Sequence, residues 1–292
     1  MTAKANRRKQ GIQKLSVIVF IMICAILLFA AQKYHKEEIY GDGLTVHFID
    51  VGQGDSILLM SDDGNVLIDA GPNSAEEALS AYLKSVNVKK IDYLILTHPH
   101  EDHIGGADMI LYNFDVGTVI MSDADSATAT YERLIAALET SDAVLYEARS
   151  GDTYRFGDLS LRLLAPNSDK YKNLNNFSVV VKASFGDVDF MLTGDAEVLS
   201  EKEILERYSE RELRCDILKA GHHGSNTSTS DKFLGAVHPE ICIISCGANN
   251  TFGHPGAATL SKLNRLGTPY LRTDIDGTIV IKTDGKTWNR VR

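Results

Sequence analysis

The sequence contains little cysteine. Four residues (Cys24, Cys215, Cys242 and Cys246) among 292 are too few for a disulfide framework, and their spacing lacks the paired CxxC units of a structural zinc ribbon. The apolar run around Cys242 and Cys246 predicts buried, inert thiols. There is no fixed-period repeat and no low-complexity tract. With 44% hydrophobic and 24% charged residues, the composition excludes a disordered or collagen-like chain.

Basic charge is scarce outside the N-terminal segment. Residues 1–40 hold seven Lys or Arg and two Glu, so a total net charge of −9 leaves −14 for residues 41–292. A protein that binds nucleic acid through general electrostatics needs a basic surface. The composition therefore argues against that mode of binding for the main part of the chain.

Long apolar runs are limited to one segment, residues 15–31, which contains no charged residue. Its length is at the short end of what crosses a bilayer, and five Lys or Arg precede it. These features predict a basic cytoplasmic tail (1–14), a single transmembrane helix (15–31), a linker (32–42) and an extracellular domain (43–292) at the cell membrane. The alternatives are a cleaved signal peptide, although the cleavage-site pattern is poor, and a buried core helix.

The rest of the chain reads as two similar halves. Strand patterns at 44–49, 56–60 and 65–68 precede a helix with a Ser74/Glu77 capping box, a buried strand at 92–96 and helices at 104–112 and 128–140. Strand patterns at 153–156, 159–164, 177–185 and 188–193 then precede alternating helices and strands. Two such halves predict an α/β protein in which two sheets pack face to face with helices outside, a four-layer αββα sandwich.

The densest group of candidate ligands is His98-Pro99-His100-Glu101-Asp102-His103, placed where a strand should end. Imidazole and carboxylate groups in this spacing suit borderline or hard divalent cations. His98 and His100 can face one ion, while Asp102 and His103 open the next helix and can reach a second. A metal site explains this pattern better than a histidine-rich surface turn does.

The pattern His98-x-His100-x-Asp102-His103 resembles the signature of the metallo-β-lactamase fold. Three further motifs resemble that family in the same order: Asp69 at a strand end, Thr193-Gly194-Asp195, and Gly221-His222-His223-Gly224-Ser225. The resemblance covers residues 44–292. It implies two divalent metal ions, Zn or Mn, held by His98, His100, Asp102, His103, Asp195 and His222, with Asp195 as the bridge and Asp69 orienting a ligand.

A narrower resemblance rests on Asp50-Val51-Gly52-Gln53-Gly54-Asp55-Ser56, Asn175-Asn176-Phe177-Ser178, Lys219-Ala220-Gly221-His222-His223-Gly224-Ser225 and Phe252-Gly253-His254-Pro255. Together these are similar to the extracellular hydrolase domain of ComEC-type competence proteins, which are multi-span DNA-uptake channels. With one candidate span, this chain resembles the hydrolase domain and not the channel.

The sequence departs from many family members because it has no histidine between His103 and His222. The resemblance then leaves His98, His100 and Asp195 at the first ion, completed by water or an asparagine oxygen. A site richer in oxygen admits manganese beside zinc. His222 is the expected ligand of the second ion, and His223 is the alternative.

Several residues are candidates for contacts with substrate. The resemblance makes His254 a phosphate-contacting or proton-donating residue; the alternative is a loop histidine satisfied by backbone. Lys219 either adds a positive charge near the substrate phosphate or is a surface lysine. Asn176 and Ser178 are further candidates for binding, whereas the Gly52–Asp55 stretch is expected to be a tight turn against the metal site.

These expectations lead to a membrane-anchored, outward-facing, metal-dependent phosphodiesterase, with Asp102, Asp195 and His254 as the catalytic residues and DNA as the expected substrate. The lipid bilayer is its second partner, through residues 15–31, and its oligomeric state stays open. Three alternatives remain: a cell-wall phosphoesterase of the phosphorylcholine type, a β-lactam hydrolase, and a DNA-docking module without catalysis.

Overall fold

The computed structural model describes residues 18–26 and 43–292. The chain divides into two units, Met1–Gly41 and Asp42–Arg292. Residues 18–26 are helical, and the rest of the predicted span at 15–31, together with the predicted tail (1–14) and the predicted linker (32–42), lies outside the described residues. Within the described ranges, no helix is both long enough and apolar enough to cross a membrane.

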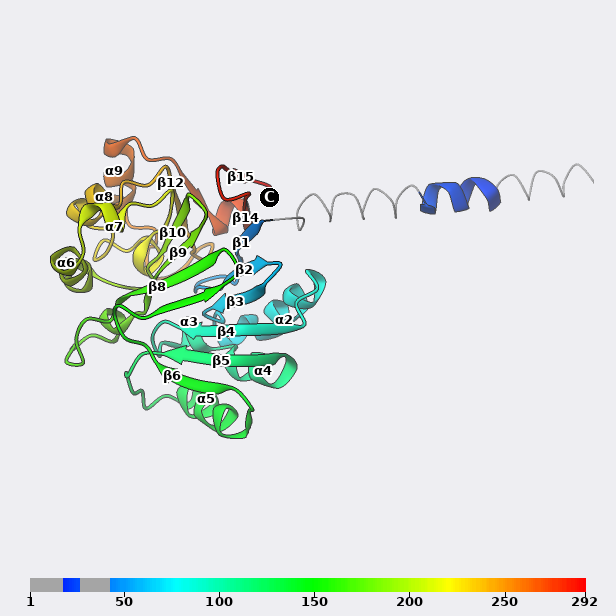
Figure 1. The fold of residues 1–292 in the computed structure, drawn as a ribbon, viewed down its shortest axis with the longest axis horizontal. Coiled ribbons are helices and arrows are strands. Elements are labelled where there is room, and N and C mark those ends of the chain that lie inside the picture. Colours follow the sequence, from blue (N-terminus) through cyan, green and yellow to red (C-terminus); the bar gives the residue numbers. More distant parts are fainter. Residues whose placement is uncertain (1–17, 27–42) are drawn as a thin grey trace, which may run out of the picture. The chain divides into compact units, whose positions relative to one another are not determined.

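Two sheets form the centre of the larger unit (Figure 1). The first has the order β15-β14-β1-β2-β3-β4-β5-β6, and the second has the order β13-β12-β11-β10-β9-β8-β7. The strands of the first sheet are β1 (Leu44–Phe48), β2 (Ile57–Ser61), β3 (Gly64–Ile68), β4 (Lys90–Leu96), β5 (Asp115–Met121), β6 (Val144–Glu147), β14 (Ile279–Thr283) and β15 (Trp288–Arg290). Those of the second are β7 (Thr153–Phe156), β8 (Leu159–Ala165), β9 (Val180–Phe185), β10 (Val188–Leu192), β11 (Ile217–Lys219), β12 (Ile241–Ile244) and β13 (Tyr270–Arg272).

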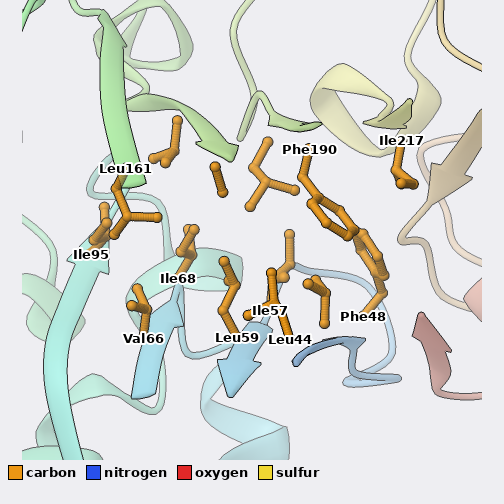
Figure 2. Packing of buried hydrophobic residues seen from close by; sticks show 14 of the residues in the cluster. Leu44, Phe48, Ile57, Leu59, Val66, Ile68, Ile95, Leu161, Phe190 and Ile217 are labelled. Atoms are coloured by element: carbon orange, nitrogen blue, oxygen red, sulfur yellow. The ribbon is translucent and has the colours of Figure 1, made fainter. Parts of the chain in front are cut away.

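The main core lies between the two sheets. Successive residues of a strand point to opposite faces, so alternate apolar residues of each sheet meet there. In β10, for example, Phe190 belongs to the core between the sheets, whereas Met191 belongs to the cluster between the second sheet and its helices. Figure 2 shows Phe48 of β1 and Phe190 pointing toward one another across this core. Burial of these side chains stabilises the pairing of the two halves.

Helices form the two outer layers (Figure 1). The first sheet is covered by α2 (Glu76–Ser85), α4 (Ala107–Asn113) and α5 (Ala129–Thr140), and the short α3 (Glu101–Ile104) follows β4. The second sheet is covered by α6 (Val198–Arg207), α7 (Glu210–Leu213), α8 (Asp231–Val237) and α9 (Ala257–Leu266), while α10 (Thr273–Asp276) joins β13 to β14. Three 3₁₀ turns complete the fold, at Asn73–Ala75, Leu174–Phe177 and Gly221–Gly224.

The predicted four-layer α/β/β/α sandwich is confirmed, with differences in detail. The chain does not divide strictly into one sheet per half, because β14 returns to pair antiparallel with β1. The prediction of a Ser74/Glu77 capping box is wrong. A 3₁₀ turn precedes α2, and its N-cap residue is Ala75, whose side chain cannot accept a hydrogen bond. The helix predicted at 104–112 is divided between α3, which ends at Ile104, and α4, since Gly106 leaves the helical range with φ −91° and ψ 2°.

Parallel strands bring the candidate residues to one edge of the sandwich. In the first sheet β3 and β4 are parallel, and in the second sheet β10, β11 and β12 are parallel. The carboxyl ends of parallel strands lie at the same edge of a sheet, where α/β proteins hold their functional loops. The loops after these strands carry the histidine and aspartate motifs.

Candidate metal centre

Each motif follows the end of a different strand. Asp69 follows β3, the segment from His98 to His103 follows β4, Asp195 follows β10, and the pair His222 and His223 follows β11. Most of these side chains are buried; His98, His103, Asp195 and His223 are each 0–1% exposed. The loops after two strands of each sheet therefore meet in one polar cluster, at the edge that the two sheets share.

Asp195 lies at the middle of the cluster, and its two carboxylate oxygens face different histidines. Its Oδ1 is 3.3 Å from Nε2 of His103 and 3.5 Å from Nε2 of His223. Its Oδ2 is 3.6 Å from Nε2 of His222 and 3.9 Å from Nε2 of His98. A carboxylate with ligands on both oxygens is the arrangement expected of a bridge between two cations.

Two sets of ligand atoms surround this carboxylate. On the Oδ1 side, donor atoms of Asp102, His103 and His223 lie within 4.8 Å of one another. Donor atoms of His98, His103 and Asp195 lie as close together, and His98 Nε2 is 2.9 Å from His100 Nδ1. The structure thus brings together all of the ligands expected from the sequence: His98, His100, Asp102, His103, Asp195 and His222.

The positions of the late histidines differ from the expectation. His223, the alternative, contacts Asp102 through its Nε2 at 3.1 Å, whereas His222 lies on the Oδ2 side with His98. Both residues have left-handed backbone angles, φ 50° and 53°, which is uncommon outside glycine. This turn separates the two ring centroids by 6.0 Å. His222 can therefore fill the remaining position at the first ion, which the sequence analysis assigned to water or an asparagine oxygen.

A shell of hydrogen bonds holds the ligands in place. Asp69, itself at φ 59°, accepts hydrogen bonds from the Thr97 backbone N–H (2.8 Å) and hydroxyl (2.8 Å), and its Oδ2 lies 2.7 Å from His103 Nδ1. This is the orienting role expected of Asp69. Because Nδ1 of His103 is engaged, its Nε2 is the atom left to face the cluster.

Lys219 occupies a position that neither sequence hypothesis described. Its side chain is fully buried, so it is not a surface lysine, and it does not line the cavity described below. Its Nζ donates to the Gly194 carbonyl at 2.9 Å and forms an ion pair with Asp55, and it lies 4.0 Å from Asp195. Asp55 also approaches His223 Nδ1, at 3.3 Å. Lys219 therefore stabilises Asp55 and Asp195 from the buried side of the cluster, opposite the cavity.

Asn176 and Ser178 also lie behind the cluster and not on the cavity wall. The Asn176 side-chain oxygen accepts from the Ser200 N–H at 3.2 Å. The Ser178 hydroxyl accepts from the Asp195 N–H at 3.0 Å and lies 3.3 Å from His98 Nδ1. In this structure both residues position other groups. Asn175, which sequence reasoning did not select, also contacts a candidate ligand, with Nδ2 3.3 Å from His222 Nδ1.

The electrostatics of the cluster fit divalent cations. Burial alone would lower the pKa of His223, but the carboxylates of Asp195 and Asp55 outweigh it and raise that pKa to about 10. The pKa of His103 is also raised, against burial, by Asp195 and Asp69. His103 Nε2 and Asp195 Oδ1 are buried and have no hydrogen-bond partner among the described residues. A cation would satisfy both atoms and replace the protons.

An open cavity of about 650 Å³ gives access to the cluster. Asp102, Asp195, His100 and His222 belong to its lining, together with Val51, Gly52, Gln53, Pro72, Ser74, Pro99, Glu101, Thr128 and Phe252. The Gly52–Asp55 turn packs against the site as expected: Asp55 N–H donates to the Asp102 carbonyl at 3.1 Å, and a Cβ on Gly54 would overlap that carbonyl. A substrate can therefore reach the ligands from this side.

His254 lies beside the late histidines. Its ring centroid is 5.2 Å from that of His222 and 6.1 Å from that of His223. Burial and these two neighbouring imidazoles lower the pKa of His254 to about 4, so the ring is neutral near pH 7. A neutral imidazole can still donate an N–H to a phosphate oxygen, or accept a proton, but it is not an imidazolium acid there.

The motif order and this geometry agree with a known family. Residues 49–247 match the family model described as the metallo-beta-lactamase superfamily. The chain belongs to that superfamily. Its fold is therefore that of a metal-dependent hydrolase, for which divalent cations are the implied cofactors, and the buried unpartnered atoms of His103 and Asp195 fit them.

Curated relatives of this superfamily member include competence proteins. It is 32% identical over 275 residues to ComE operon protein 3 of Bacillus subtilis, covering 88% of this chain and 35% of that protein. It is 28% identical to competence protein ComA of Neisseria gonorrhoeae, covering 87% and 35%. Recombination protein 2 of Haemophilus influenzae is also 28% identical, covering 80% and 28%. The chain thus spans about a third of the length of these relatives, consistent with a ComEC-type hydrolase domain.

Solved structures share the fold at low sequence identity. The metallo-beta-lactamase fold protein YhfI from Bacillus subtilis superposes with a TM-score of 0.57 at 10% identity, covering 82% of this chain and all of that one. CmlA, a diiron beta-hydroxylase from Streptomyces venezuelae, gives 0.55 at 12% identity, covering 83% of this chain and 54% of CmlA. At these identities the likeness supports the fold alone.

Proposed function

We propose that this protein is a phosphodiesterase that uses two divalent cations, zinc or manganese, to cleave DNA, and that residues 15–31 anchor it to the cell membrane with the hydrolase domain outside. The observation that carries the catalytic part is the position of Asp195, whose two oxygens face separate sets of histidines at the floor of an open cavity. When bound there, paired cations supply an activated water and stabilise the charge that develops on phosphate oxygens.

The residues of this chain have distinct roles in the proposal. Asp195 joins the two ligand sets, one centred on His98, His100 and His222 and the other on Asp102, His103 and His223. Lys219 and Asp55, which are both buried, keep Asp195 and His223 in position. His254, neutral near pH 7, is placed to donate a hydrogen bond to the substrate or to its leaving group.

DNA is the proposed substrate because the curated relatives carry competence and recombination names, and because paired divalent cations stabilise negative charge on phosphodiester oxygens. The membrane anchor rests on the uncharged segment 15–31 and the five basic residues before it. The helix over residues 18–26 carries exposed apolar side chains, including Phe20 at 67% and Ile26 at 65%, which suits contact with lipid.

The test is hydrolysis by the purified full chain loaded with Mn²⁺ or Zn²⁺. Bis-p-nitrophenyl phosphate, single-stranded DNA, duplex DNA and p-nitrophenylphosphorylcholine are the substrates. The proposal expects cleavage of the diester and of DNA that EDTA abolishes and that an Asp195→Asn preparation, purified in parallel, lacks. If the loaded protein cleaves neither bis-p-nitrophenyl phosphate nor DNA, the proposed DNA phosphodiesterase fails. If it then still binds DNA, a docking module is the better account, and cleavage of the phosphorylcholine ester alone would favour the cell-wall alternative.

A further inference from the structure

A large aromatic side chain is exposed at the rim of the metal cavity. Phe252 is 68% exposed and belongs to the cavity lining, as do the apolar residues Val51 and Pro99. Exposing a phenyl ring to water is unfavourable, and exposed apolar surface at a ligand cavity is more often used for binding than surface elsewhere. The ring is therefore accessible to a partner that enters the cavity.

The loop that carries Phe252 is held in place from its base. Asn250 donates through Nδ2 to the Gly247 carbonyl at 2.9 Å and to the His254 carbonyl at 2.6 Å, and its Oδ1 accepts from the His254 N–H at 2.9 Å. These three bonds close the loop around Phe252. A ring on a pre-organised loop loses little conformational entropy when it binds a ligand.

Phe252 is separated from the metal ligands by one ring. Its centroid is 5.9 Å from that of His254, with an interplanar angle of 24°, and His254 in turn is 5.2 Å from His222. A flat group that stacks on Phe252 is thus near the ligand cluster but not on it. In a nucleotide, the base and the phosphate are separated in the same way, by the sugar.

Basic side chains do not hold a polyanion at this site. The residues that line the cavity include Glu101, Asp102 and Asp195 but no Lys or Arg. A nucleic acid is therefore held here by the cations and by contacts that do not depend on charge. Gln53, another lining residue, has its amide oxygen fixed by the Gly247 N–H at 3.1 Å, and its amide nitrogen donates no hydrogen bond within the described part of the chain.

We propose that Phe252 is a stacking platform for an unpaired nucleobase next to the scissile phosphate, which makes single-stranded DNA the preferred substrate class. The proposal rests on the phosphodiesterase function above and adds a base subsite to it. Every base has an aromatic face, so such a platform gives affinity without sequence preference. In a duplex both faces of a base are already covered by its neighbours, so the platform favours single strands.

The experiment compares binding of two oligomers by the full chain. One is a single-stranded oligodeoxynucleotide containing 2-aminopurine, and the other is an abasic oligomer of the same length with a terminal fluorophore. Binding is measured with the metals removed by EDTA and, separately, kcat/KM for each oligomer is measured with Mn²⁺. Phe252→Ala, Phe252→Leu and Phe252→Trp are compared with wild type. Tyr112→Ala, a change at an exposed aromatic residue that does not line the cavity, is the matched control.

We expect wild type to quench 2-aminopurine and to prefer the oligomer with bases. Phe252→Ala should reduce that preference by roughly 5- to 150-fold, the range for loss of one base–aromatic stack. Phe252→Leu should behave like Ala, Phe252→Trp should retain the preference, and metal content should be unchanged in all three. Tyr112→Ala should match wild type.

Failure of the subsite and failure of the function give different results. If the loaded wild type cleaves DNA but the preference for bases is absent or survives Phe252→Ala, the platform is wrong and the phosphodiesterase stands. If the wild type cleaves nothing yet Phe252→Ala abolishes quenching, the platform stands without the enzyme. If Phe252→Ala weakens p-nitrophenylphosphorylcholine hydrolysis and leaves the oligomers unaffected, the ring binds a quaternary ammonium group and the nucleobase proposal is overturned.

Discussion

His222 and His223 are neighbours in sequence but serve opposite oxygens of Asp195, with His222 Nε2 3.6 Å from Oδ2 and His223 Nε2 3.5 Å from Oδ1. Two successive residues in the left-handed region make this possible, because they turn the chain so that its side chains diverge over a short distance. A single dipeptide thereby supplies one ligand to each proposed ion.

This division predicts the effects of removing each histidine. Wild type loaded with Mn²⁺ or Zn²⁺ should hold two ions. His222→Ala and His223→Ala should each lower the affinity for one of the two ions by roughly 10- to 100-fold or more. Elemental analysis after dialysis against limiting metal is the measurement. His238→Ala, a change at an exposed histidine outside the cavity, is the control. If His222→Ala leaves both ions in place, His222 is not a ligand.

Asp195→Asn keeps the size of the side chain and removes its charge. Since Asp195 faces both ligand sets, the affinity for both ions should fall, and diester hydrolysis should fall by on the order of a hundredfold or more. Hydrolysis of bis-p-nitrophenyl phosphate at saturating Mn²⁺ is the measurement. Asp158→Asn, at an exposed residue of a β-hairpin turn, should retain full activity. Equal activity of the two variants would remove Asp195 from the mechanism.

Metal binding should release protons. In the metal-free protein the pKa of His223 is raised to about 10, so this imidazole is protonated at pH 7, and a cation must displace that proton to bind. Apparent affinity should therefore rise with pH up to about 10 and level off above it. Calorimetry in buffers of different ionisation enthalpy gives the number of protons released. Binding heats that do not depend on the buffer would contradict this account.

Lys219→Met should destabilise the fold. The substitution leaves the buried carboxylate of Asp55 without its lysine partner, and breaking a buried pair in this way costs about 3–5 kcal/mol. Urea unfolding of the metal-free protein measures the loss. Adding Asp55→Asn to Lys219→Met should recover part of it, because the unpaired charge is then removed. If the double variant is less stable than Lys219→Met, the ion pair is not the cause.

The anchor proposal predicts the side of the membrane on which the domain lies. With five basic residues before segment 15–31 on the cytoplasmic side, protease added to intact cells should degrade residues 43–292. Immunoblotting against a C-terminal tag follows the digestion, and a cytoplasmic marker protein should survive it. Degradation only after lysis would mean that the orientation is wrong, and recovery of the chain in the soluble fraction would mean that there is no anchor.

Sequence periodicity and motif order were sufficient to predict the layers and the place of the site. Strands such as Thr153–Phe156 coincide with the expected bounds, because alternation and turn residues are local signals. The pairing of Lys219 with Asp55 could not be predicted in this way, since Lys219 ends β11 of the second sheet, Asp55 lies in the loop between β1 and β2 of the first, and the two meet only in the folded chain. The separation of His222 from His223 depends on backbone angles that no residue type in the motif dictates.

The ligand cluster joins the two halves of a protein whose four cysteines are all free. The segment that follows β4 of the first sheet supplies His98, His100, Asp102 and His103. The segments that follow β10 and β11 of the second sheet supply Asp195, His222 and His223. Bound cations would therefore act as a reversible cross-link across the sandwich. Because a ligand that binds only the native state stabilises it in proportion to the logarithm of its concentration, the resistance of this protein to unfolding should follow the supply of metal around it.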